Sequence, residues 1–141
     1  MELNGHLYVK PTNQILQDHG LQDMGPVQKF IDSELIRLMG PYTPMRNGML
    51  EKSATLSTVI GSGLVQQHTP YARYQYYGKL MVSSVTGSAW ASKGESKILT
   101  DKDLEYSKHQ HPMAGKMWFE RMKADRKEDI LKGAQEVINR Q

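Results

Sequence analysis

The feature that most limits the fold is an amphipathic stretch enclosed by helix-boundary residues. Pro26 opens it and Gly40-Pro41 closes it. Proline suits the first turn of a helix because its missing N–H has no partner there, whereas glycine followed by proline ends a helix. The sequence therefore predicts a helix over about 26–39, with one apolar face that must pack on another element. That face consists of Val27, Phe30, Ile31, Leu35 and Leu38.

A second helix signal lies at the C-terminal end of the chain. From Lys116 onward the pattern is helical, but its apolar stripe breaks off after Met122 at the segment KADRKED. The stripe then resumes, and the pattern predicts a long helix over about 116–139. Such a helix either leaves the core and returns to it or gives its far end to a partner. The resumed stripe consists of Ile130, Leu131, Ala134, Val137 and Ile138.

Shorter elements are predicted elsewhere. The segment GHLYVK, residues 5–10, is typical of a strand closed by Pro11, and a brief helix follows through Leu16. Residues 55–68 contain two strand-like runs around Gly61-Ser62-Gly63, which predicts a β-hairpin. The segment KLMV, residues 79–82, predicts a further strand.

Residues 83–110 are rich in Ser, Gly, Thr, Lys and Asp and have few apolar anchors, which predicts a long loop. With 141 residues, the chain fits one domain, 1–141. We expect an α+β fold, in which the helices at about 26–39 and 116–139 pack on a small, mainly antiparallel sheet.

Composition narrows the function. The chain has no cysteine and a formal net charge of +3, so thiolate chemistry is impossible and no concentrated basic stripe marks a nucleic-acid binder. No apolar run approaches the ~18 residues of a membrane span, and the start resembles no leader peptide, so we expect a soluble product with no membrane contact.

No motif predicts catalysis. His109 and His111 lie two positions apart without a standard metal motif around them, and Gly61-Ser62-Gly63 lacks the Lys and Ser/Thr of a phosphate loop. We therefore expect no enzyme, no catalytic or metal site and no cofactor.

Four tyrosines and an arginine lie together in TPYARYQYYGKL, residues 69–80. Pro70 and Gly78 delimit about two helical turns, with Tyr71, Tyr74 and Tyr77 near one face and Arg73 and Tyr76 on the other. Aromatic rings and arginine suit base stacking, but tyrosines on both faces of a short helix can also pack their rings and keep their hydroxyls at a wet edge, which suits cores and protein interfaces. Packing and contact is the favoured interpretation, and binding of single-stranded DNA or RNA through residues 71–77 is the alternative.

Three sequence blocks resemble one family. PMRNGMLEKSA (44–54), PYARYQYYG (70–78) and HPMAGKMWFERM (111–122) resemble the minor capsid proteins of the head-tail joining type, the neck or tail-completion proteins of siphophages and prophages of Gram-positive bacteria. The resemblance spans about residues 25–138. The motif residues that carry it are Pro44, Gly48, Leu50, Ser53, Tyr71, Ala72, Gly78, Pro112 and Trp118.

The physical reading of these residues agrees with the resemblance: Gly48 is expected to permit the turn before a short helix, Leu50 to anchor that helix and Ser53 to end it near the predicted hairpin. Trp118 is expected beneath the sheet at the root of the last helix. Tyr71, Tyr74 and Tyr77 are expected to fix their helix against the sheet. Arg73, Tyr76 and Trp90 are expected at a subunit interface.

The resemblance implies a structural virion protein, made in the cytoplasm of the bacterial host. It implies a ring of identical subunits, for which a hexamer is one candidate, in the neck or tail of the virion. The ring joins the phage head to the tail and lines or seals the DNA channel. Its implied partners are the adjoining head-closure or connector protein, the tail-terminator protein and phage DNA, which passes through without sequence-specific binding.

Overall fold

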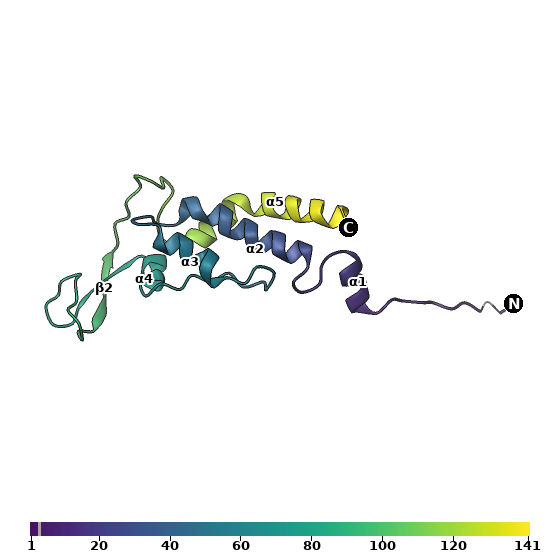
Figure 1. The fold of residues 1–141 in the computed structure, drawn as a ribbon, viewed down its shortest axis with the longest axis horizontal. Helices are drawn as coiled ribbons and strands as arrows, with labels where there is room; N and C mark the ends of the chain where they lie inside the picture. The colour runs from purple at the N-terminus through teal and green to yellow at the C-terminus, as the bar shows by residue number, and fades with distance from the viewer. Residues whose placement is uncertain (3) are drawn as a thin grey trace.

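A computed structural model describes residues 1–2 and 4–141. Two helices, α2 (Pro26–Met39) and α5 (Trp118–Asn139), lie side by side and form the body of an elongated molecule (Figure 1). Both were predicted with nearly these bounds. Helix α2 begins at a proline in its first turn and ends where Gly40 leads into a 3-10 turn, Gly40–Tyr42.

The two helices approach closely because α5 carries a glycine at the contact. A Cβ built on Gly133 would lie only 2.4 Å from Phe30 Cζ of α2. Ile130 and Ala134 are buried on the same side of α5. The far end of α5 therefore returns to the core within the same chain, which answers the question that the broken apolar stripe raised.

The core lies where α2, α5 and a third helix, α3 (Met49–Ser57), meet. Trp118 and Met122 are its most buried large apolar side chains, with exposed fractions of 2% and 0%. Removal of such side chains from water is the main stabilising term of a domain of this size. The other buried apolar members are Leu38, Met39, Tyr42, Leu50, Ala54, Ala72 and Ile130.

The N-terminal region differs from the prediction in one respect. Helix α1 (Thr12–Asp18) forms as expected, but residues 4–11 are extended without strand pairing and run away from the body (Figure 1). We call residues 4–11 the N-terminal arm. The predicted strand over 5–10 is wrong for the isolated chain, because no other strand of the described residues lies beside it.

The predicted β-hairpin over 55–68 is also wrong. Helix α3 continues through Thr55 and Leu56 to Ser57, and the residues that follow form an irregular loop. Thr58 ties this loop together: its Oγ1 accepts from the Gln66 N–H at 3.0 Å. One side chain thus replaces the ladder of backbone bonds that a hairpin would have.

The sheet comes from the later part of the chain. Strands β1 (Lys79–Ser83) and β2 (Lys97–Asp103) pair antiparallel, and they form the only sheet in the described part of the chain. The α+β class is confirmed, and β1 matches the predicted strand. β2 lies inside the segment predicted to be a loop, 83–110.

The sheet does not lie under α2 and α5 as predicted. It projects from the end of the body next to the short helix α4 (Ala72–Tyr77), whereas α2 and α5 pack on each other (Figure 1). We call residues 79–103 the hairpin. Among the described residues, no helix is both long and apolar enough to cross a membrane.

Candidate subunit interface

The segment 44–54 forms the start of α3. Gly48 adopts a left-handed conformation with φ +78° directly before the helix, which glycine tolerates and most residues do not. The Asn47 side chain accepts a hydrogen bond from the Met49 N–H at 3.1 Å, and Leu50 is buried. The turn at Gly48 and the anchor at Leu50 are as predicted. Ser53 does not end the helix: it is buried one turn inside and its hydroxyl donates to the Leu50 carbonyl at 2.7 Å.

Trp118 is the point at which the resembling blocks meet. Its indole N–H donates to Gln67 Oε1 at 2.9 Å, and the Gln67 amide donates to the Leu50 carbonyl at 3.1 Å. Its ring meets Tyr76 edge to face, with centroids 4.8 Å apart. The burial of Trp118 at the root of α5 is confirmed, but its neighbours come from the helices and from the loop after α3 and not from the sheet.

The faces of α4 are reversed relative to the prediction. Tyr76 packs against the core through Trp118, and burial raises the pKa of its phenol. Tyr71, Tyr74 and Tyr77 are exposed instead of packed on the sheet. The physical reason is that the Trp118 indole, which comes from a distant part of the sequence, decides which way this two-turn helix is rotated. The Tyr76 ring is therefore mainly a core side chain of the free chain.

Helix α4 ends as predicted. Gly78 follows it with φ +75°, and the Gly78 N–H donates to the Tyr74 carbonyl at 2.9 Å. The Leu104 N–H returns to the Gly78 carbonyl at 2.9 Å, and the Tyr106 hydroxyl donates to the Gln75 carbonyl. These bonds attach both ends of the hairpin to α4.

Helix α4 is in turn joined to the segment that leads into α5. The Met117 N–H donates to the Tyr76 carbonyl at 2.8 Å. Arg121 of α5 donates from Nε to the Lys116 carbonyl and from Nη1 to the Met113 carbonyl, both at 2.8 Å. The segment before α5, in which Pro112 is exposed, is thus fixed by backbone acceptors.

Two of the predicted interface residues are free to make contacts. Arg73 is exposed on α4, and Trp90 lies in the turn between β1 and β2 with an exposed fraction of 79%. Apolar side chains of β2, Ile98 and Leu99, are exposed nearby in the hairpin. The hairpin therefore presents apolar surface that the free chain does not cover.

A buried carboxylate that the sequence reading missed holds the loop after α3. Asp32 of α2 is 1% exposed, and its Oδ2 accepts from the N–H groups of Gly61 and Gly63 at 2.8 and 3.1 Å. Its Oδ1 accepts from the Gln28 amide at 2.8 Å. Asp32 lies on the apolar face of α2, seven positions before Met39. An acidic residue on an apolar helix face was the sequence signal from which its burial could have been predicted.

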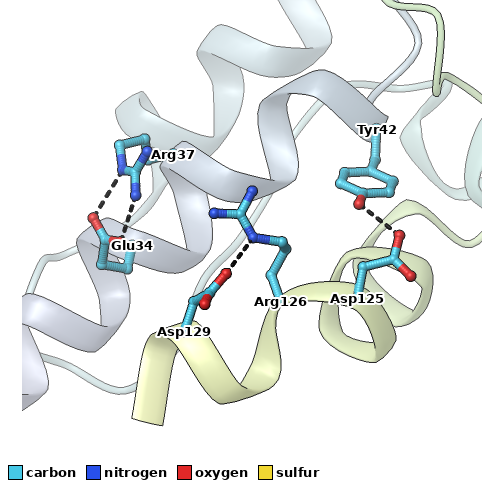
Figure 2. Close-up of polar contacts among 6 residues, drawn as sticks. All are labelled: Glu34, Arg37, Tyr42, Asp125, Arg126 and Asp129. Atoms are coloured by element: carbon cyan, nitrogen blue, oxygen red, sulfur yellow. Dashed lines mark hydrogen bonds and ion pairs between the residues drawn. The ribbon is translucent and has the colours of Figure 1, made fainter. Parts of the chain in front are cut away.

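A polar seam, shown in Figure 2, lies along the middle of α5, α2 and the turn after α2. The Tyr42 hydroxyl donates to Asp125 Oδ2 at 2.6 Å, and this bond, together with burial, raises the pKa of Tyr42. The other two contacts in Figure 2 are ion pairs within one helix, Arg37 with Glu34 and Arg126 with Asp129, each at 2.7 Å. Arg37 holds the pKa of Glu34 below its usual range. Within this seam, the bond between Asp125 and Tyr42 therefore joins the middle of α5 to the turn after α2.

The described residues hold no group of three histidine, aspartate, glutamate or cysteine side chains that would suit a metal ion. His111 has a structural contact: its Nδ1 lies 2.8 Å from the Thr43 carbonyl, and its Nε2 is 3.7 Å from Glu51 Oε2. This contact joins the segment before α5 to the turn before α3.

A sequence model of a phage structural family agrees with the three blocks. The family described as minor capsid protein matches residues 27–138, well over half of the chain. The chain belongs to the minor capsid protein family. No curated protein and no solved structure is similar enough to the chain to be matched.

The match runs from the first turn of α2 to the last turn of α5. It therefore covers the helical body and the hairpin of this minor capsid protein, and leaves the N-terminal arm and α1 outside. Membership in the family supports a structural role in the virion, and such proteins are not typically enzymes.

Proposed function

We propose that this minor capsid protein is a ring-forming component of the neck or tail-completion region, which joins the phage head to the tail. The observation that carries the proposal is the presence of two different projecting surfaces at opposite ends of one body (Figure 1). The N-terminal arm exposes Leu7 and Tyr8, and the hairpin exposes Trp90 and Leu99. A closed ring needs two different faces on each subunit, because each copy contacts its neighbours head to tail.

In this role the ring contacts a head-closure or connector protein on one side and a tail-terminator protein on the other. DNA passes through its central channel without sequence-specific contacts, which agrees with a net charge of only +3. Arg73 and Trp90 contribute to the subunit interface. Tyr76 contributes through the position of α4 more than through direct contact, because its ring packs on Trp118.

The test has two parts. Mass photometry of the purified protein over a range of concentrations is expected to give one closed multiple of the 16.0 kDa subunit. Antibody labelling of intact virions is expected to mark the junction between head and tail. Label spread over the whole head, together with a particle that stays monomeric at all concentrations, would contradict the proposal.

One observation favours the alternative function. Tyr71, Tyr74 and Tyr77 are exposed on α4, where bases could stack on them, and Arg73 lies beside them. Fluorescence anisotropy with labelled single-stranded oligonucleotides at two salt concentrations separates the two functions. Tight binding that weakens steeply with salt is expected only for a nucleic-acid-binding module.

A further inference from the structure

The N-terminal arm has the composition of a strand but no strand beside it. Leu7, Tyr8 and Val9 have exposed fractions of 90%, 81% and 64%. Aromatic and β-branched side chains favour the half-buried surface of a sheet, and extended backbone in water gains nothing from them. Pro11 follows the apolar residues, and because it has no N–H it limits a ladder to the residues before it.

The hairpin has the matching feature, a strand edge without a partner. Its sheet has two strands, so β2 pairs with β1 on one side only and its other edge is open. Six of the seven residues of β2 are exposed. An unpaired strand edge is a row of free backbone donors and acceptors, and a two-stranded sheet gains stability from a third strand.

The arm cannot fill this edge within its own chain. The arm leads into α1, and the turn after α1 is packed at the end of α5: a Cβ on Gly20 would lie 3.0 Å from Gln141 Cγ. The hairpin follows α4 directly and is tied to its end by the Leu104 N–H and the Gly78 carbonyl, and α4 is held at the start of α5 by the Met117 N–H and the Tyr76 carbonyl. Helix α5 has 22 residues and is therefore about 33 Å long.

The reach of Lys10, the last residue of the pairing segment, is shorter than this separation. Lys10 is two residues from Thr12, so it lies within about 7 Å of the start of α1, and α1 with its seven residues spans only about 10 Å. The segment that would have to pair, residues 5–10, thus stays at the opposite end of the body from β2, as Figure 1 shows. A partner for the arm has to come from another molecule.

We infer that residues 5–10 of one copy add as a third strand to the free edge of β2 in a neighbouring copy. Both segments have an uncharged centre, Leu7-Tyr8-Val9 in the arm and Ile98-Leu99-Thr100 in β2. Main-chain hydrogen bonds supply the affinity in this mode of recognition, and the side chains set the register. The inference rests on the proposed function in one respect, since it takes the partner to be the same protein.

Charge selects the orientation. When Tyr8 lies opposite Leu99, parallel pairing places Lys10 opposite Asp101, whereas antiparallel pairing places Lys10 opposite Lys97. Like charges directly opposite each other destabilise a sheet and opposite charges stabilise it, so the added strand runs parallel to β2. In the free chain Lys10 Nζ lies 2.9 Å from Asp18 Oδ2 on the surface. Such an exposed ion pair contributes little to stability, and the contact with Asp101 of the neighbouring copy replaces it.

Disulfide trapping tests the pairing, because the chain has no cysteine of its own. Two single-cysteine variants are mixed, one with an added tag so that mixed dimers are recognised by size, and mildly oxidised. Tyr8→Cys with Leu99→Cys and Lys10→Cys with Asp101→Cys are expected to give mixed dimers. Lys10→Cys with Leu56→Cys, an exposed position on α3, measures random collision.

Each outcome decides the inference. Mixed dimers from Lys10→Cys with Lys97→Cys in place of Asp101→Cys would overturn the orientation. Yields no higher than that of the Leu56→Cys control would overturn the addition of the arm to β2 of a neighbouring copy. If mass photometry still finds a ring in that case, the proposed function stands without the added strand, whereas a protein that is monomeric at all concentrations, with antibody label spread over the whole head, removes both.

A second comparison separates backbone pairing from simple apolar contact. Val9→Pro removes an N–H and constrains the arm, and it is expected to weaken self-association by at least about tenfold. Val9→Ala keeps the N–H and is expected to weaken self-association only a few-fold. Val59→Ala is the matched control, because Val59 has the same exposed fraction, 64%, outside the arm. Equal effects of Val9→Pro and Val9→Ala would overturn backbone pairing.

Discussion

The helical body buries its apolar surface within the chain, whereas the hairpin leaves its apolar surface exposed. In the body, α2, α3 and α5 cover one another, and even a carboxylate, Asp32, has hydrogen-bonding partners for both oxygens. In the hairpin, β2 is exposed on almost every residue and Trp90 points into solvent. The comparison indicates that packing within the body supplies most of the stability of the fold, whereas the hairpin leaves apolar surface uncovered.

The largest expected change in the free energy of unfolding comes from a substitution in the core of the body. Trp118→Ala removes the side chain that joins α4, α5 and Gln67, and it should lower the free energy of unfolding by about 3–5 kcal/mol through the cavity that it leaves. Trp90→Ala, the same substitution in the hairpin, should change it by no more than about 0.5 kcal/mol. Urea denaturation followed by circular dichroism measures both. Similar losses in the two variants would contradict the division between body and hairpin.

The next effect concerns the buried carboxylate. Asp32→Ala leaves the N–H groups of Gly61 and Gly63 without an acceptor and should cost about 2–3 kcal/mol. Asp32→Asn keeps an acceptor oxygen and should cost less than half as much, while Asp23→Ala on the surface is the control. Hydrogen exchange of the two glycine amides should accelerate in Asp32→Ala. Unchanged protection of these amides would show that the loop is held by other contacts.

A third variant adds one methyl group between the helices. Gly133→Ala should gain about 1 kcal/mol in helix propensity. It should nevertheless destabilise the protein by about 1–3 kcal/mol, because the added Cβ meets the Phe30 ring. Phe30→Leu should restore part of the loss in the double variant, and Lys132→Ala on the exposed side is the control. A more stable Gly133→Ala variant would mean that the helices can separate at little cost.

Alkaline pH probes three phenols that the fold keeps neutral. The pKa values of Tyr42, Tyr76 and Tyr106 are raised, the first chiefly by the hydrogen bond to Asp125 and the other two by burial. Because the raised values favour the protonated form in the folded state, their contribution is fully present below the unfolded pKa of about 10 and is lost as pH rises further. Urea denaturation at increasing alkaline pH should therefore give a falling free energy of unfolding.

Tyr42→Phe isolates one of these phenols. It should cost about 1 kcal/mol at neutral pH through loss of the bond to Asp125, and it should reduce the slope above pH ~10. Tyr74→Phe, on the exposed face of α4, is the control. A slope that is the same in Tyr42→Phe and in the unmodified protein would contradict the role of this pair.

The smallest expected effect on stability belongs to Arg73. Arg73→Ala should keep the circular dichroism spectrum and shift the free energy of unfolding by at most about 0.5 kcal/mol. Phage carrying it should accumulate filled heads and separate tails, because lysine or alanine cannot replace the forked contacts of arginine. Lys123→Ala, an exposed cation on α5, should yield joined virions. Normal virions from Arg73→Ala would remove Arg73 from the proposed interface.

The helices could be predicted because their signals are local. Pro26 and Gly40 set the limits of α2, and Gly78 ends α4 through its own backbone conformation. Helix α3 was predicted too short, because Leu56 was assigned to a strand run although it is exposed at the end of the helix.

The remaining features depend on residues far apart in the sequence. The sequence KILTDKD has too many charges to indicate a strand by itself, and it becomes β2 only through pairing with β1. The rotation of α4 depends on Trp118, and the loop after α3 depends on Asp32. The local periodicity of the sequence gives no sign of these contacts, so they could not be predicted from it. Part of the candidate interface, Trp90, could be selected because a large aromatic side chain in a polar segment has no local packing partner.

The length of α5 has a geometric consequence for any assembly built through both ends of the molecule. The helix acts as a fixed spacer, because its Gly133 contact with α2 prevents it from sliding along its neighbour. Each residue inserted into a helix lengthens it by about 1.5 Å and rotates everything beyond it by about 100°. A chain with one extra residue in α5 would therefore present its hairpin in a different direction, whereas an extra seven residues would nearly restore the direction and change mainly the distance. The number of residues between Trp118 and Asn139 therefore sets the distance between the two ends of the molecule, and with it the diameter of any assembly built through both ends.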